Sequence, residues 1–249
     1  MNEVNNRRAI SNIIVAIILV IGAIASSMIL VNGVVKVKSS QTNIVVTGSA
    51  KQKITSDLIV WTGSFSTQSN QLQDAYTKLE ASKQKVSDYL VKQGIAKEDI
   101  VFSSINTSIN YVMNDYGVYT NIIDSYHLSE TITISSNEIE KITDISRKAT
   151  ELLSEDIAFQ SDPPQYFYTK LADMKVNMLA EATKDAKKRA EMMAENAGNK
   201  LGALKYADMG VMQITPLYSN EISDYGINDT SSLEKEITAV VHCKFEIAE

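Results

Sequence analysis

The sequence predicts an α+β fold in which an N-terminal transmembrane helix precedes an antiparallel-rich sheet with three helices. Segments in which apolar and polar residues alternate, as in half-buried strands, recur along the chain. Between them, apolar residues recur three and four positions apart, as on one face of a helix. Residues 9–35 carry no charge at all. Together these patterns also predict a pseudo-duplicated arrangement of β-α-β-β units.

The uncharged N-terminal run is long enough to cross a membrane. Roughly 20 apolar residues span a bilayer, and residues 13–31 are almost entirely apolar. Arg7 and Arg8 precede the run, which favours a cytoplasmic N-terminus and an exported body. Ala23-Ile24-Ala25 has the form of a signal-peptidase site, so a cleaved signal peptide is the alternative.

The same run divides the chain into three parts. We expect residues 1–35 to form a cytoplasmic tip and a transmembrane anchor (or a signal peptide), with residues 10–35 in contact with the lipid bilayer. Residues 36–42 form a polar linker, and residues 43–249 form one folded domain.

Composition excludes several classes of function. The net charge is −6, so the chain lacks the basic surface with which proteins bind nucleic acid. Cys243 is the single cysteine, so no intrachain disulfide can form. The two histidines, His127 and His242, supply few ligands for a zinc or iron site. Ser82 and Lys85 have the spacing of a Ser-x-x-Lys nucleophile without its partner motifs. We therefore expect no nucleic-acid partner, no metal and no cofactor.

Two strands and a helix open the folded domain. Strands are expected at residues 43–50 and 57–67 because apolar and polar residues alternate there. The helix that follows has its apolar residues at helical spacing, and Ser69 or Asn70 can cap its first turn. Gly94 then ends the helix, because glycine readily takes the left-handed conformation of a C-terminal stop.

A long hairpin and a second helix come next. Residues 100–112 and 122–135 alternate on either side of a tip at Asn114-Asp115-Tyr116-Gly117, which predicts two antiparallel strands. The second helix is expected to begin at Asn137, with Glu140 completing a capping box.

The longest helix is expected between Tyr168 and Gly202. Its apolar stripe is thin because alanines recur at every fourth position: Ala182, Ala186, Ala190 and Ala194. Small side chains let a helix approach a sheet closely, so we expect it to pack in the core, with a coiled-coil or membrane-surface helix as the alternative. Pro163 and Pro164 are expected to set up its first turn. Strands then follow up to Ile214 and over residues 233–247.

The two halves of the domain share one order of elements: strand, helix, glycine stop, strand, Asp-Tyr-Gly tip and strand. Residues 57–135 and 156–247 both fit it, the second half beginning with a short strand at residues 156–160. The sequence therefore predicts two copies of a β-α-β-β unit with related strand orders.

Short stretches in a fixed order characterise the folded part. They are Val45–Ala50, Ser56–Leu58, Gly94-Ile95, Asp99-Ile100, Ser125-Tyr126, Thr131–Ile134, and in the long helix Ala182, Asp185-Ala186, Ala190-Glu191, Ala194, Gly198 and Leu201-Gly202. In these the chain resembles the SIMPL-domain family of bacterial envelope proteins, which includes a periplasmic immunogenic protein of pathogens. Residues 43–249 are thus expected to be a SIMPL-like domain. The chain departs from the family at Ser56, where proline is usual, and at Ser154-Glu155-Asp156, where glycine is usual.

The resemblance implies an α+β fold, an extracytoplasmic location and large ring-like homo-oligomers, and some members are linked to tolerance of oxidative stress. Combined with the N-terminal run, it implies a single-pass protein of the bacterial cell membrane whose C-terminal domain is extracytoplasmic. The family has no agreed active site, so we expect a non-enzymatic, self-assembling envelope protein. A monomeric module that binds an envelope ligand or a partner protein is the alternative.

Tyrosines near the two tips are the candidate interaction residues. Tyr111, Tyr116 and Tyr119 surround the first tip, and Tyr218 and Tyr225 lie near the second. Tyrosine brings a large contact area at low entropic cost, which suits protein–protein contacts. Local packing of these side chains onto the hairpins is the alternative.

Overall fold

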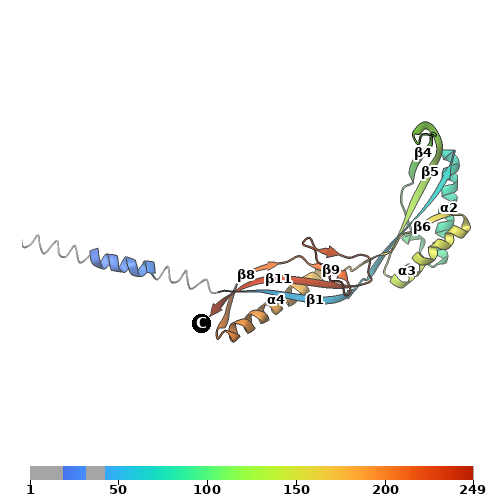
Figure 1. The fold of residues 1–249 in the computed structure, drawn as a ribbon. Coiled ribbons are helices and arrows are strands. Elements are labelled where there is room, and N and C mark those ends of the chain that lie inside the picture. The colour runs from blue at the N-terminus through green and yellow to red at the C-terminus, as the bar shows by residue number, and fades with distance from the viewer. Residues whose placement is uncertain (1–18, 32–42, 249) are drawn as a thin grey trace, which may run out of the picture. The chain divides into compact units, whose positions relative to one another are not determined.

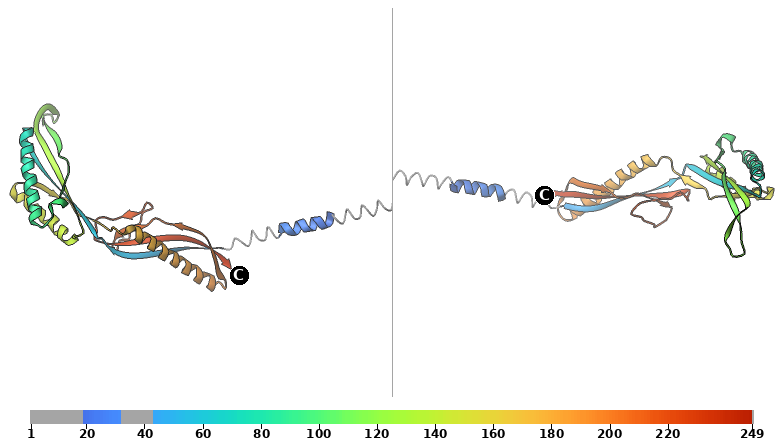
Figure 2. Two further views of the ribbon diagram at one scale, coloured as in Figure 1. Left: turned by 180° about the vertical axis from the view of Figure 1, so that it is seen from behind. Right: turned by 90° about the horizontal axis from the view of Figure 1, so that it is seen from above.

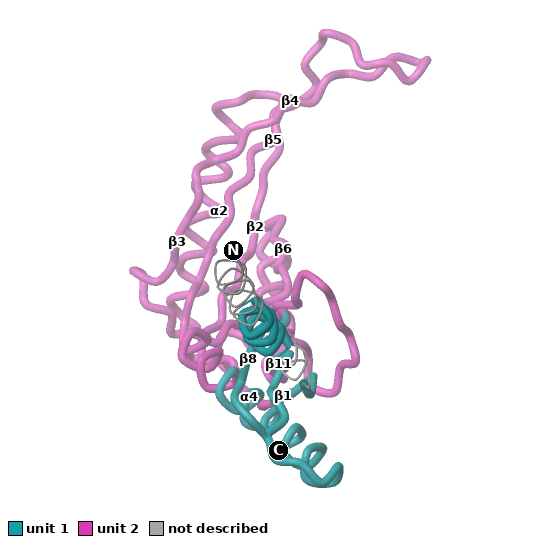
Figure 3. The backbone as a smooth tube through the Cα atoms, turned by 90° about the vertical axis from the view of Figure 1, so that its left-hand side faces the viewer, with its two compact units in different colours: residues 1–50, 179–210, 240–249 teal, residues 51–178, 211–239 magenta. Residues whose placement is uncertain are grey.

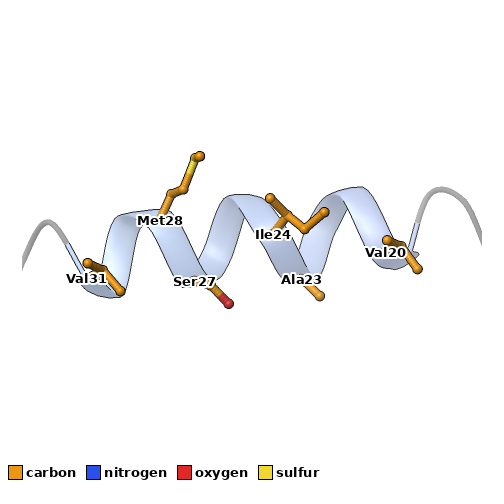
Figure 4. Close-up of a pocket in the computed structure, with 6 residues that line it drawn as sticks. All are labelled: Val20, Ala23, Ile24, Ser27, Met28 and Val31. Carbon is orange, nitrogen blue, oxygen red and sulfur yellow. The ribbon is translucent and has the colours of Figure 1, made fainter.

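The computed structural model describes residues 19–31 and 43–248. Residues 19–31 form a helix whose side chains are all exposed, and Figure 4 shows six of them along it. Among the described residues, no helix has both the length and the apolar character that crossing a bilayer requires. Arg7, Arg8 and the expected linker at residues 36–42 lie outside the described residues.

The strands of the described residues form two sheets (Figure 1). Their bounds are β1 Asn43–Thr55, β2 Leu58–Ser69, β3 Val101–Phe102, β4 Asn106–Met113, β5 Tyr119–Ser136, β6 Ala158–Ser161, β7 Gln165–Phe167, β8 Lys200–Met209, β9 Gln213–Pro216, β10 Ile227–Asn228 and β11 Glu234–Ala248. The six-stranded sheet has the order β3-β5-β2-β6, with β4 also paired to β5 and β7 to β2. The five-stranded sheet has the order β1-β11-β9-β10, with β8 also paired to β11.

Three α-helices accompany these sheets: α2 (Leu72–Lys92), α3 (Ile139–Lys148) and α4 (Leu171–Asn196). Short 3-10 helices occupy Lys97–Asp99 and Ala149–Glu155. The pairings within the six-stranded sheet are antiparallel, whereas β9 and β10 run parallel. The predicted α+β class with three helices and antiparallel-rich sheets is therefore confirmed.

Glycine ends α2 and α4, but α4 is shorter than expected. Gly94 has a φ of 86° and closes α2, with the Ile95 amide bonded to the Leu90 carbonyl oxygen at 3.1 Å. Gly198, with a φ of 76°, closes α4 in the same way. The chain then enters β8 at Lys200, so the prediction that the helix region extends to Gly202 was wrong.

The predicted helix starts also need correction. Pro163 and Pro164 do not open α4, because β7 follows them and the helix begins only at Leu171. Neither α2 nor α3 has a side-chain cap, so Ser69, Asn70 and Asn137 do not play that part. The Ser69 hydroxyl instead donates to the Asp74 carboxylate at 2.6 Å, inside the first turn of α2.

The two sheets share a strand order, although not with the segments that the sequence suggested. In the six-stranded sheet β5 lies between β2 and the strands β3 and β4, and in the five-stranded sheet β11 lies between β1 and the strands β8 and β9. The segment expected to begin the second copy forms β6, which pairs with β2 in the other sheet. Because β1 takes its place beside β11, the prediction that residues 156–247 form a continuous second copy was wrong.

At both positions where the chain departs from the SIMPL pattern, Ser56 and Asp156, the main chain has a distinct local feature. The amide of Ser56 donates to the Leu233 carbonyl oxygen at 2.9 Å, a hydrogen bond that proline could not make. Asp156 has a φ of 60°, so an aspartate here adopts the left-handed conformation that glycine takes most easily.

The chain divides into two compact units, coloured separately in Figure 3. Unit 1 comprises residues 1–50, 179–210 and 240–249, and unit 2 comprises residues 51–178 and 211–239. In unit 2, β2, β5 and β6 and the helices α2 and α3 enclose a core that includes Trp61, Phe65, Leu79, Leu90, Leu128, Ile132, Ile134, Ile142, Leu152 and Phe159.

In unit 1, α4 lies along β1 and β11 (Figure 2), and it approaches β1 very closely at Gly48. A Cβ atom on Gly48 would lie 2.2 Å from the Ala182 carbonyl oxygen and 2.6 Å from the Ala186 Cβ. The alanines of the stripe, Ala182, Ala186, Ala190 and Ala194, are fully buried, which confirms the predicted core-packing role of the helix.

A carboxylate fixes the register of this contact. Asp185 on α4 accepts a hydrogen bond from the Ser49 amide at 2.9 Å and another from the Arg189 Nε atom at 2.8 Å. The Ser49 amide is the main cause that holds the pKa of Asp185 below its usual value. Gly48 therefore packs against the alanine stripe, while the next residue, Ser49, bonds to the carboxylate of Asp185 beside that stripe.

Replacing Gly48 with alanine is expected to lower the free energy of unfolding by about 2 kcal/mol or more, because the added methyl group meets helix backbone that cannot move aside cheaply. Ser49→Ala is the matched control: it removes an exposed hydroxyl but keeps the amide that bonds to Asp185, so its effect should stay within about 0.5 kcal/mol. Urea unfolding followed by circular dichroism measures both. Equal midpoints for the two variants would contradict the proposed close packing.

Candidate interaction surface

The hairpin built from β4 and the start of β5 is almost free of charge. From residue 100 to residue 123 the only charged side chain is Asp115. We refer to residues 106–123 as the β4–β5 hairpin. A chain with a net charge of −6 thus presents one long segment that is close to neutral.

The β4–β5 hairpin extends beyond the sheet that it belongs to. β4 pairs with β5 from Asn106 opposite Ser129 to Met113 opposite Tyr119. The pairing of β5 with β2 stops at Tyr126, so residues 119–125 have β4 as their only strand neighbour in the described structure. Figure 3 shows the resulting two-stranded ribbon reaching away from the rest of unit 2.

Both faces of this ribbon are open to solvent. Every residue of β4 is exposed, so the alternation in its sequence does not mark a buried face, unlike the alternation in β2. The exposed apolar side chains of the hairpin are Ile109, Tyr111, Val112, Met113, Tyr116, Val118, Tyr119, Ile122 and Ile123. A concentration of exposed apolar side chains on one segment of a folded protein often marks a place of contact with another molecule.

The tip of the hairpin is ordered by its own hydrogen bonds. The Asn114 side-chain oxygen accepts from the amides of Tyr116 at 3.1 Å and Val118 at 3.0 Å. Gly117 takes a φ of 76°, which closes the turn. Tyr116, whose amide takes part in this turn, is 92% exposed.

The five candidate tyrosines fall into two groups on different sheets. Tyr111, Tyr116 and Tyr119 belong to the β4–β5 hairpin, whereas Tyr218 and Tyr225 lie in the loop between β9 and β11. Their exposed fractions run from 43% for Tyr111 to 97% for Tyr225. Tyr218 is partly engaged, because the Lys53 ammonium lies 5.1 Å from the centre of its ring.

Two buried charges escaped the sequence analysis. Lys235 is 2% exposed, and its ammonium donates to the carbonyl oxygens of Tyr166, at 2.6 Å, and Asp229. Glu130 is also 2% exposed and forms an ion pair with Lys83 at 2.7 Å. The sequence alone could have indicated that both side chains are buried. Each occupies a position in phase with the buried apolar residues of its strand.

The surroundings of Lys235 indicate a structural part. Burial lowers the pKa of Lys235, and the nearby charge of Asp229 opposes that effect. The cavity beside it measures about 60 Å³, space for a few water molecules. Lys235 therefore links the strand β7 to the loop before β11 through its two hydrogen bonds.

The other residues with possible chemistry are dispersed. The His242 Nδ1 atom lies 3.0 Å from the Thr47 hydroxyl, and burial raises the pKa of the Cys243 thiol. Lys85 donates to the carbonyl oxygen of Glu155. Within the described ranges, no three His, Cys, Asp or Glu side chains gather closely enough to hold a metal ion.

Unit 1 has a wide, shallow hollow of its own. It measures about 900 Å³ and is lined by Val45, Val46, Thr47, Arg189, Met192, Met193, Asn196 and Ala197. None of the five candidate tyrosines lines it. The concave site that a binding module would need is thus separate from the residues predicted to make contacts.

Comparison with known protein families identifies a match to most of the folded domain. Residues 44–245, from β1 to β11, match the SIMPL family, which is described as a protein of unknown function (DUF541). No curated protein matches the chain. The match covers both sheets and the β4–β5 hairpin.

Replacing Lys235 with methionine is expected to lower the free energy of unfolding by roughly 2–4 kcal/mol, because two carbonyl oxygens lose a charged donor. Lys244→Met on the same strand is the control, since that side chain is exposed and should change stability by less than about 0.5 kcal/mol. Urea unfolding can be followed by the fluorescence of Trp61, the single tryptophan. If both variants unfold at the same urea concentration, the buried ammonium has no structural role.

Proposed function

The chain belongs to the SIMPL family, and on that premise we propose that it is a membrane-anchored, extracytoplasmic envelope protein that assembles with copies of itself through the β4–β5 hairpin and catalyses no reaction. The observation that carries the proposal is the exposed, nearly uncharged ribbon formed by residues 106–123.

The hairpin suits contact between identical chains. Each copy carries a net charge of −6, so copies repel one another over most of their surface. The hairpin has Asp115 as its only charge, and its exposed tyrosines supply the aromatic area that interfaces favour. The alanine stripe of α4 is buried within unit 1, so it is not available as a contact surface between copies.

The N-terminal segment supports the membrane anchor. Residues 9–35 are uncharged and follow Arg7 and Arg8, an arrangement that favours export of the domain that follows. The described part of this segment, residues 19–31, exposes all of its side chains, and most of them are apolar. An exposed apolar helix is stable in lipid and unfavourable in water.

The absence of catalysis is proposed from the surroundings of the titratable groups. Lys235 is committed to main-chain carbonyls and Glu130 to Lys83, each inside a packed core. The wide hollow of unit 1 is lined by one charged residue, Arg189. A catalytic site would require several polar groups that converge on an open cleft.

That hollow supports a second candidate function. Its lining combines apolar side chains with Arg189 and Asn196, a composition that suits a small apolar or amphipathic ligand. On this alternative the protein is a monomeric envelope binding module, and the hairpin contacts a different protein.

Light scattering of the full chain in mild detergent should give a mass that is a multiple of 27.5 kDa after subtraction of the detergent. Changing Tyr111, Tyr116 and Tyr119 together to serine should weaken association by about tenfold or more, because interface tyrosines commonly contribute over 1 kcal/mol each. Changing Tyr218 and Tyr225 to serine is the control and should leave the mass unchanged. A monomer at every concentration would refute self-assembly and favour the binding module.

A further inference from the structure

The outer edge of β4 lacks the features that keep sheet edges apart. Natural proteins protect exposed edge strands with charged residues, proline or a covering element. β4 has no charged residue and no proline, and β5 is its only strand partner in the described structure. The edge strand β8, by contrast, carries Lys200, Lys205 and Asp208. The edge at β8 is therefore protected against pairing with another strand, whereas the edge at β4 is not.

The hydrogen bonds of β5 determine which of its residues face β4. The Ser103 amide donates to the Thr131 carbonyl oxygen at 2.8 Å, so Thr131 directs its main-chain groups to this side of the strand. Main-chain groups alternate in direction along a regular strand. The register of β5 with β2 is unbroken over residues 126–136, so Ser129 and His127 also face β4.

It follows that alternate amides of β4 point away from the hairpin. The residues opposite Ser129 and His127 are Asn106 and Ser108, whose main-chain groups are used within the ladder. The main-chain N–H and C=O groups of Thr107 and Ile109 face the opposite side of β4. On that side, no strand of the described residues pairs with β4. The edge thus presents main-chain donors and acceptors at the spacing of a further strand.

The side chains of β4 fit an antiparallel copy of the same strand centred on Ile109. In that register Ile109 lies opposite its own counterpart and Thr107 lies opposite Tyr111, a pairing of a β-branched with an aromatic residue that stabilises sheets. On the other face Ser108 lies opposite Asn110, and these side chains can exchange a hydrogen bond. No charge meets a like charge anywhere along the strand.

We propose that the outer edges of β4 in two copies of this protein pair antiparallel about Ile109, so that two hairpins form one four-stranded ribbon across a two-fold axis. This inference rests on the proposed self-assembly and assigns the contact through which it occurs. The occupant of the edge is a second copy because the edge is neutral and matches itself on both faces, whereas other acidic surfaces of the chain would repel a copy.

Cross-linking of the full chain in its native membranes tests the pairing. In a Cys243→Ala background, the single cysteine of Ile109→Cys would lie directly opposite its counterpart, and a short bis-maleimide should join two chains. Ile122→Cys is the control: it is more exposed than Ile109, 65% against 41%, but lies on β5. In the four-stranded ribbon the two β5 strands would be about 14 Å apart, beyond the reach of the reagent. Ile109→Cys should therefore cross-link several-fold more than Ile122→Cys.

A second pair of variants separates the main-chain contact from side-chain packing. Ile109→Pro removes the outward amide and leaves the bonds between β4 and β5 in place. Ile109→Thr keeps that amide and shortens the side chain. Light scattering of the full chain should show that the proline variant loses assembly while the threonine variant retains it, with circular dichroism confirming that both are folded.

The outcomes distinguish this contact from self-assembly in general. If the wild-type chain assembles but Ile109→Pro leaves its mass unchanged and Ile109→Cys cross-links no better than Ile122→Cys, the β4 pairing is wrong and self-assembly stands. If Ile109→Cys joins to a different protein, a second copy is not the occupant. If the wild-type chain is monomeric, both proposals fail.

Discussion

The close approach of α4 to β1 at Gly48 is the contact on which unit 1 depends. Because Gly48 has no side chain, the helix can lie so near the strand that only alanine fits on its inner face. The Ser49 amide then bonds to Asp185 and fixes the helix along the strand. The two stretches that most strongly resemble the SIMPL family, Val45–Ala50 and the alanine helix, are therefore the two sides of one contact.

Unit 2 contains an extended apolar core, and two of its charged side chains, Lys235 and Glu130, are also buried. Lys235 and Glu130 occupy positions that would ordinarily hold apolar residues, and each has its partner nearby: main-chain carbonyls for Lys235 and Lys83 for Glu130. Removing such a partner leaves a charge uncompensated in the core, which is why these groups are fixed in place. These two buried charges thus help to hold the fold of unit 2.

The β4–β5 hairpin differs from the rest of the surface because it is exposed and carries a single charge. An isolated two-stranded ribbon is only marginally stable in water. This ribbon is supported at one end by the six-stranded sheet and is uncovered along its length. The outer edge of β4 is free and uncharged, although the chain as a whole is acidic. This edge is the specific contact through which the proposed self-assembly would occur.

The sequence alone located the main helices and several strands and indicated the family. Helical spacing located α2, α3 and α4, alternation located β2 and β11, and glycine located the end of α2 at Gly94, because these signals arise between residues close together in the chain. The resemblance to the SIMPL family was confirmed over residues 44–245.

Only the tertiary structure decided which strands are partners and which faces are covered. Alternation identifies a strand but does not specify its neighbour, so β6 could be assigned to the second repeat although it pairs with β2. The same alternation occurs in the buried strand β2 and in β4, which is exposed on both faces. The physical reason is that burial depends on whether another layer packs on a strand, and that layer is built from residues distant in sequence.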